Sequence, residues 1–310
     1  MDRDHAQKSV NESRNGVLAL CLTFFIWGVA PAYWKLLETI PSFEIILHRM
    51  VWSLFFLLPF FWREKQRAEF MSICTQPKTM GSLLITTSLL SVNWFIYVWA
   101  INHKHILEAS MGYYINPLVN VLLGMIFLKE RLSRLQVLSV LFAFAGVLNL
   151  SISYGVLPWI ALSLALTFGF YGLIRKVITV QPVTGLTIET AIVCLPAIAI
   201  LVYLSANGSG GFQVSAPGMG VLLMGTGLVT AVPLVLFTVG ARRVHLTTVG
   251  FLQYLAPSIS FLLAIFVYGE PFTRPMLVTF ILIWVALIIY SMDSILVYRS
   301  AGIHGDKQSG

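Results

Sequence analysis

The stretch LQVLSVLFAFAGVLNLSISYGVLPWIALSLALTFGFYGLI, residues 135–174, decides the fold because 40 consecutive residues contain no charged side chain. A helix that crosses a bilayer needs about 20 predominantly apolar residues. The stretch therefore predicts two crossings. The segment SISYG at 151–155 lies between them and carries the glycine and polar residues typical of a turn.

The rest of the chain repeats this pattern. Further charge-free stretches run over 79–103, 109–128, 190–241 and 244–269. The whole chain is 57% apolar and 11% charged, against about 25% charged in an ordinary soluble domain. We expect an all-α membrane protein, and no ten-residue alternation typical of a transmembrane barrel appears. Ten transmembrane helices are predicted, at 16–37, 43–62, 79–101, 106–128, 134–152, 156–174, 185–205, 217–240, 246–268 and 275–297.

The distribution of basic residues predicts the orientation. With the N-terminus inside, the inner segments collect sixteen Lys and Arg residues and the outer segments three. Cytoplasmic loops carry this excess, so both termini are expected in the cytoplasm. The net charge of +7 then reflects orientation, and no nucleic-acid partner is expected. The alternative that the first span is a cleaved signal peptide, with a site at 30–32, is disfavoured because the apolar run continues to Leu37.

An internal repeat relates the two halves of the chain. A shift of 140 residues aligns Tyr114 with Tyr254, Pro117 with Pro257, and Glu130 with Glu270. Five spans per copy would place the second copy upside down in the bilayer, the arrangement of several transporter folds with a midplane site. We expect a first five-helix half at 1–152, a second at 153–300 and a cytoplasmic tail at 301–310. The alternative is a duplicated scaffold without a transport role.

Three ionisable residues open the second span. Glu44 and His48 are four residues apart and share a helical face, and Arg49 follows directly. A charged side chain at the centre of a membrane helix costs about 2.5–3.5 kcal/mol. Two interpretations remain: Arg49 snorkels outward, or Glu44, His48 and Arg49 line the mouth of a cavity that binds a carboxylate or relays protons.

Polar residues also share faces of the third and fourth spans. Asn93 and Tyr97 are one helical turn apart, and Tyr113, Asn116 and Asn120 follow at spacings of three and four. Such a stripe suits either a packing seam between helices or a cavity wall.

Two further candidates lie in the second half. Gln253 aligns with Tyr113 in the repeat, and Glu189 lies one turn inside the seventh span. An intramembrane acid is by default a functional hypothesis. Glu44 is the first candidate for a coupling group and Glu189 the second.

Several motifs are absent from the sequence. It has no GxxxxGK[ST] phosphate loop, no HExxH, no CxxC and no GxSxG. We therefore expect no enzyme activity, no catalytic residues, no cofactor and no metal site.

The chain resembles the RarD family, which is part of the EamA-type branch of the drug/metabolite transporter superfamily. The resemblance covers about residues 16–297, and its motifs are WGVAP at 27–31, EIILHR at 44–49, NW at 93–94, the block 108–131, FYGLIRK at 170–176 and FLQY at 251–254. It implies a ten-helix permease of the bacterial inner membrane, often labelled a chloramphenicol-sensitivity protein. It brings no agreed binding residues.

These observations favour a secondary transporter that carries a small metabolite, amino acid or drug by alternating access, outward and coupled to protons. The alternative is a non-transporting membrane sensor or accessory protein that affects drug tolerance indirectly. Saturable, gradient-dependent flux by the purified protein would separate the two.

Overall fold

The computed structural model describes residues 2–103, 105–155, 159–208, 217–269 and 273–307. Within these ranges every regular element is helical. The elements in chain order are α1 (Asp2–Lys35), α2 (Ser42–Leu57), the 3₁₀ helix η1 (Leu58–Trp62), α3 (Glu64–Cys74), α4 (Pro77–Asn102), α5 (Ile106–Phe127), α6 (Arg134–Tyr154), α7 (Trp159–Val177), α8 (Pro182–Ala206), α9 (Pro217–Ala241), α10 (Leu246–Gln253), α11 (Leu255–Phe266) and α12 (Arg274–Lys307).

Ten apolar segments in this part of the chain match the ten predicted spans. Nine are long and apolar enough to cross a membrane, and the apolar part of α5, Met111–Phe127, is the tenth. The chain is thus an all-α, multi-pass membrane protein, as predicted. Large apolar side chains such as Leu195 and Phe266 are exposed on the outside of the bundle, where lipid would cover them.

The turn between α6 and α7 begins where the sequence predicts it. Ser133 begins α6 with a capping box, in which its hydroxyl accepts from the Gln136 backbone N–H and its own N–H donates to the Gln136 side chain. Gly155 follows the end of α6 with a left-handed φ of 64°, a conformation that glycine adopts without the Cβ penalty. The SISYG segment therefore ends the helix by known capping chemistry.

The ninth predicted span is two helices that meet at Tyr254. Proline has no N–H, so Pro257 cannot donate to the carbonyl four residues earlier, which belongs to Gln253. α10 ends at Gln253 and α11 begins at Leu255. The break places the Gln253 side chain at the point where the two helices meet.

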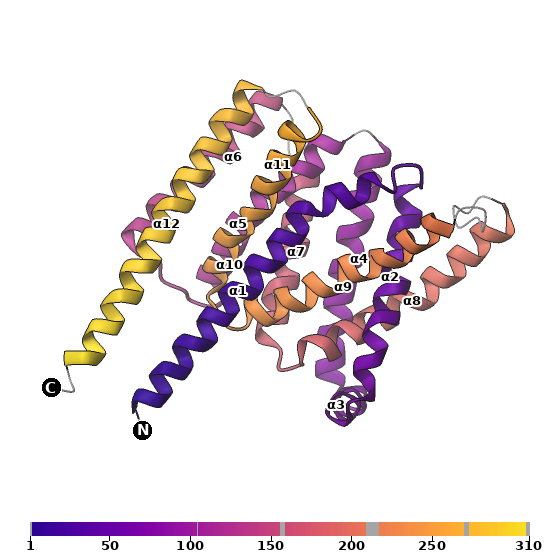
Figure 1. The fold of residues 1–310 in the computed structure, drawn as a ribbon, viewed down its shortest axis with the longest axis horizontal. Coiled ribbons are helices and arrows are strands. Elements are labelled where there is room, and N and C mark those ends of the chain that lie inside the picture. The colour runs from indigo at the N-terminus through magenta and orange to yellow at the C-terminus, as the bar shows by residue number, and fades with distance from the viewer. Residues whose placement is uncertain (1, 104, 156–158, 209–216, 270–272, 308–310) are drawn as a thin grey trace.

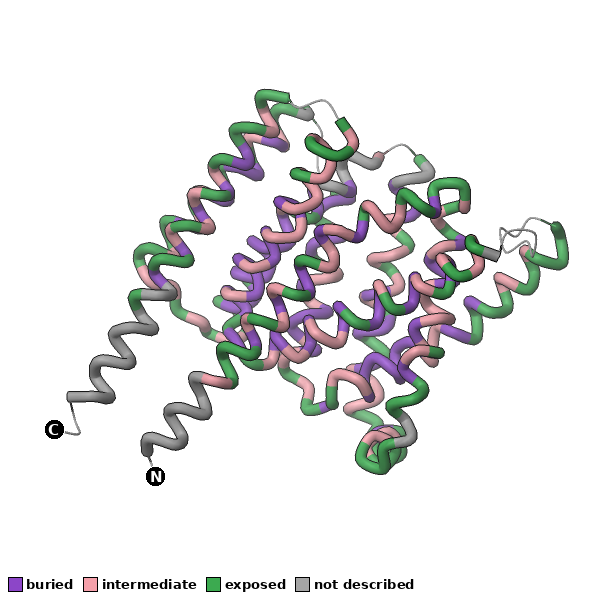
Figure 2. The backbone as a smooth tube through the Cα atoms, viewed as in Figure 1, coloured by how far each residue is buried: buried purple, intermediate pink, exposed green. Residues whose placement is uncertain are grey.

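Figure 1 shows how the helices are arranged. α6 and α12 run side by side at one edge of the bundle, and α1, α5, α7 and α10 lie at its centre. The start of α1 and the end of α12 lie on the same side of the bundle, which we call the terminal end; the turn after α1, at 36–41, lies at the opposite end. Figure 2 shows that buried residues concentrate in the central helices.

Several helix contacts occur in matching pairs. If α1, α4 and α5 correspond to α7, α9 and the α10–α11 pair, the α1–α9 contact matches the α4–α7 contact. Likewise, α1–α11 matches α5–α7, and α6 packs on its own counterpart α12. The boundary between the halves at 152/153 remains a prediction.

Candidate functional site

A cavity of about 800 Å³ lies between the central helices. Its walls come from α1, α2, α4, α5, α6, α7, α9, α10, α11 and α12. Many lining residues are near the opposite end of their helices: Arg49 is in the second turn of α2, and Ala264 is in the last turn of α11. The cavity is therefore displaced from the terminal end of the bundle. Pockets that bind small molecules have volumes of roughly 300–1,000 Å³.

Arg49 is the sole charged residue among the described residues that line this cavity. Its Nε donates to the Thr230 hydroxyl of α9 over 2.9 Å. Its guanidinium carbon lies 5.0 Å from the ring centroid of Trp34 and 5.2 Å from that of Trp94, within range for cation–π attraction. These contacts hold the side chain against the wall of the cavity, the position that the cavity interpretation predicts.

Aromatic side chains form much of the remaining wall. Tyr97 and Tyr113 meet edge to face with ring centroids 6.4 Å apart, and the exposed part of Tyr113 belongs to the cavity lining. Asn93 donates to the Leu164 carbonyl and to the Thr167 hydroxyl, each over 2.9 Å. Asn93 thus joins α4 to α7 and also lines the cavity, so its packing and cavity roles coincide.

An amide cluster lies along the cavity toward the terminal end. Asn120 donates to the Gln253 side chain over 2.7 Å and to Asn116 over 3.2 Å. Asn116 and Gln253 line the cavity, whereas Asn120 is fully buried behind them. Nearby, the Tyr254 hydroxyl donates to the Tyr114 carbonyl over 3.2 Å. These contacts connect α5 to the break between α10 and α11.

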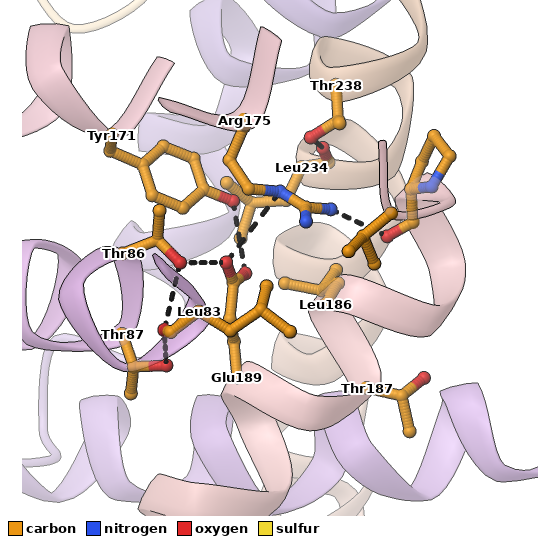
Figure 3. A network of polar contacts seen from close by, with 12 residues as sticks. Leu83, Thr86, Thr87, Tyr171, Arg175, Leu186, Thr187, Glu189, Leu234 and Thr238 are labelled. Carbon is orange, nitrogen blue, oxygen red and sulfur yellow. Dashed lines mark hydrogen bonds and ion pairs between the residues drawn. The ribbon is translucent and has the colours of Figure 1, made fainter. Parts of the chain in front are cut away.

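A second polar cluster surrounds Glu189, with its members drawn in Figure 3. Glu189 accepts from Thr86 of α4 over 2.6 Å and from Tyr171 of α7 over 3.4 Å. The Nε of Arg175 lies 3.7 Å from Oε1 of Glu189, with both side chains almost completely buried. Arg175 also donates to the Pro182 carbonyl over 3.0 Å. The cluster thus joins α4, α7 and the first turns of α8.

Glycine is required beside this ion pair. A Cβ at Gly185 would lie 2.0 Å from a terminal nitrogen of Arg175. The guanidinium therefore occupies the space that a side chain at position 185 would fill. The absence of a side chain at this turn of α8 lets Arg175 reach Glu189.

Glu44 and His48 form a separate pair. Their closest N–O separation is 3.8 Å, and both are buried in α2. Neither belongs to the described lining of the large cavity, although Arg49, the next residue along, does.

The structure divides the ten predicted site residues into three groups. The cavity lining contains Arg49, Asn93, Tyr97, Tyr113, Asn116 and Gln253, with Asn120 directly behind it. Glu189 lies in the Arg175 cluster, and Glu44 and His48 in the α2 pair. Sequence reasoning missed Trp34, Thr230 and Arg175. The predicted span ends at residue 174, directly before Arg175, but the residue is inside α7 and fully buried.

Two glutamates from the connecting segments cap helices at the terminal end. Glu130 accepts from the Leu246 N–H over 2.6 Å and from both the N–H and hydroxyl of Thr247, at the start of α10. Glu69 of α3 accepts from the Gln181 N–H and the Thr184 hydroxyl at the start of α8. Carboxylates at these positions satisfy N–H groups that the helix leaves unpaired.

The surroundings of Glu130 keep it ionised. Burial alone would raise its pKa, but the hydrogen bonds from Thr247 and Leu246 and the proximity of His245 outweigh that effect. The pKa of Glu130 therefore lies below the usual value for a glutamate.

Comparisons with known proteins identify the family. The model of the EamA-like transporter family matches residues 14–152. Protein RarD of Escherichia coli (strain K12) is 45% identical over 289 residues, which cover 93% of this chain and 97% of that protein. The chain belongs to the RarD family of EamA-type transporters.

A second RarD protein supports this assignment, and one solved structure has a similar fold. The "Chloramphenicol-sensitive protein RarD" of Pseudomonas aeruginosa is 31% identical over 94% of this chain and 99% of its own length. A protein known from a crystal structure, 17% identical, aligns with a TM-score of 0.69 over 89% of this chain and 97% of that one. The RarD-family relatives are bacterial, and the chain is a multi-pass membrane transporter of their kind.

Proposed function

We propose that this RarD-family protein is a secondary-active exporter that carries a small solute by alternating access and couples its movement to protons. The observation that supports the proposal best is the cavity of about 800 Å³, because both predicted halves line it. Arg49 from α2 is held by Thr230 from α9, and Asn116 from α5 lies beside Gln253 from α10. Inverted-repeat transporters bind their substrates at such an interface.

The positions of the contacts support an outward-facing state. At the terminal end, Glu130 binds the start of α10, and Lys176 donates to the Ala241 carbonyl over 2.8 Å and to that of Val244. The cavity lies toward the opposite end. If the termini are cytoplasmic, as the basic residues predict, the solute site faces the exterior while these contacts close the cytoplasmic side.

Glu189 is the coupling group that the geometry favours. A small void of about 10 Å³ is lined by Glu189 and by Leu90 and Trp94, which also line the large cavity. That volume is close to the minimum for one water molecule. Protonation of Glu189 would remove its charge attraction to Arg175 and weaken the link between α7 and α8. The Glu44–His48 pair is the alternative relay.

The test uses purified protein in liposomes that contain a pH-sensitive dye. Amino acids, other metabolites and chloramphenicol are added one at a time, with empty liposomes as the control. We expect at least one solute to move protons only when protein is present, and Glu189→Gln to abolish that movement. Silence across the panel from folded protein would contradict proton-coupled transport of these solutes and favour a non-transporting sensor.

The matched variant is Glu44→Gln. If proton movement survives in Glu189→Gln and is lost in Glu44→Gln, the α2 pair is the relay and the assignment of coupling to Glu189 is wrong.

A further inference from the structure

The large cavity pairs one fixed positive charge with aromatic walls. Among the described residues that line it, Arg49 carries the sole formal charge, and no described carboxylate lies within ion-pair distance of its guanidinium. The two acids predicted as coupling groups have other partners: Glu44 pairs with His48 and Glu189 with Arg175. An unpaired cation in an apolar site is costly unless a ligand or water satisfies it.

The contacts of Arg49 leave part of its hydrogen-bonding capacity for a ligand. A guanidinium has five N–H donors, and the Nε donor of Arg49 binds the Thr230 hydroxyl. Trp34 and Trp94 hold the group through their ring faces and accept no conventional hydrogen bond from it. Arg49 lines the cavity and is only partly buried. A planar fork of two N–H donors matches the two oxygens of a carboxylate.

The other lining residues indicate the chemistry of the rest of the ligand. Phe168, Phe261 and Phe280 line the cavity together with the tryptophans, a surface that suits an aromatic or apolar body. The amides of Asn116 and Gln253 offer neutral hydrogen bonds on the terminal side. No described acid lines the cavity to hold an ammonium group.

We infer that the cavity selects small organic anions: a carboxylate or similar group on Arg49 and an aromatic or apolar body between the rings, in preference to cations, neutral analogues and zwitterions. This inference rests on the proposed function, because it names the substrate class of the same cavity.

The test is a charge series on one ring: benzoate, benzamide, benzylamine and phenylalanine, titrated calorimetrically into purified protein in detergent. We expect benzoate to bind about tenfold or more tightly than each of the other three, as a charge-assisted fork requires. Equal or tighter binding of any of the other three would overturn the inference, as would failure of all four to bind. The comparison of the four ligands uses wild-type protein only, so the result does not depend on whether any variant folds.

Variants then assign the preference to one residue. In Arg49→Gln the preference for benzoate over benzamide should disappear, while Arg49→Lys should keep part of it because the charge remains without the fork. Arg63→Gln, which removes an exposed arginine that also lies over an aromatic ring, is the matched control and should bind like the wild type. An unchanged preference in folded Arg49→Gln protein would show that another group binds the anion.

A flux measurement separates this inference from the proposed function. Benzenesulfonate stays charged and crosses bare lipid poorly, so its uptake into liposomes reports the protein. Accumulation of benzylamine beyond that in empty liposomes, without accumulation of benzenesulfonate, would leave transport standing and overturn the anion assignment. Binding of benzoate without flux of any probe would support the anion site and contradict transport.

Discussion

Arg175 and Glu189 form a buried ion pair outside the cavity. Loss of either charge leaves the other charge buried without its partner. Glu189→Gln keeps the hydrogen-bonding shape but leaves the arginine uncompensated, and breaking a buried pair typically costs about 3–5 kcal/mol. We expect a lower thermal midpoint in detergent for Glu189→Gln. The double variant Arg175→Met/Glu189→Leu should recover most of the loss.

The double variant is the decisive member of this cycle. If it is less stable than Glu189→Gln alone, the ion pair is not the source of the loss. If the double variant is stable, a transport assay on it separates a loss of stability from a loss of coupling. The double variant lacks the carboxylate that is proposed to carry the proton, so proton movement should stay absent.

Gly185 gives a second prediction at the same scale. The Cβ of Gly185→Ala would overlap the Arg175 guanidinium, and overpacking of a buried site costs about 1–3 kcal/mol. We expect a lower thermal midpoint. Gly81→Ala is the matched control, because a Cβ there meets no atom within 4 Å and alanine favours the helix over glycine by up to about 1 kcal/mol. Equal effects of the two substitutions would contradict the close approach.

At this scale the sequence identified polar residues better than it identified their partners. The helical spacing of Tyr113, Asn116 and Asn120 correctly predicted a shared face, since that spacing depends on one helix alone. Arg175 follows directly after the predicted span 156–174, and its burial depends on Gly185 of the next helix. Contacts of this kind come from tertiary packing.

At the scale of elements, Glu130 fixes the start of α10 from a different segment of the chain. Loss of a helix-capping side chain costs roughly 0.5–2 kcal/mol, so Glu130→Gln should be less stable by about that amount at neutral pH. Because the folded state lowers the pKa of Glu130, its contribution is complete above the ordinary glutamate pKa. It is lost as the pH falls through the lowered folded value.

The measurement is the thermal midpoint of both proteins between pH 7 and pH 3. The difference between the wild type and Glu130→Gln should be constant near neutrality and shrink only at acidic pH. A difference that grows on acidification would contradict the sign of the shift.

Hydropathy predicted all ten spans because each depends on its own composition and length. It did not predict α3 as a separate helix, since that segment is too polar to span a membrane, or the break at Tyr254. Pro257 follows the break by three residues, but Pro117 lies inside the uninterrupted α5. Which proline breaks its helix depends on the packing around it.

At the scale of the whole molecule, the predicted orientation can be read by chemical labelling. Cys74 of α3 is exposed near the terminal end, and Glu38 is exposed in the turn at the opposite end. In single-cysteine proteins, an impermeant maleimide should label Glu38→Cys in intact cells. It should label Cys74 only after the membrane is opened.

The reverse labelling pattern would invert the topology and with it the proposed direction of export. Labelling of both sites in intact cells would contradict the assignment of the two ends to opposite sides of the membrane.

The sequence indicated the two-half organisation through the spacing of Tyr114 and Pro117 relative to Tyr254 and Pro257. It could not locate the cavity, whose lining is drawn from ten helices. Glu44 and His48 share a face with each other, as predicted, but that face is not part of the described lining.

The single charge of Arg49 has an electrical consequence. An empty cavity bears a net positive charge among its described lining residues, and a cavity that holds a monoanion is neutral. Only the return of the empty carrier then moves charge through the membrane field. The free energy of moving one elementary charge fully across a potential of 100 mV is about 2.3 kcal/mol. An inside-negative voltage draws the vacant site toward the cytoplasm, so the resting potential itself would reset an exporter of organic anions after each delivery.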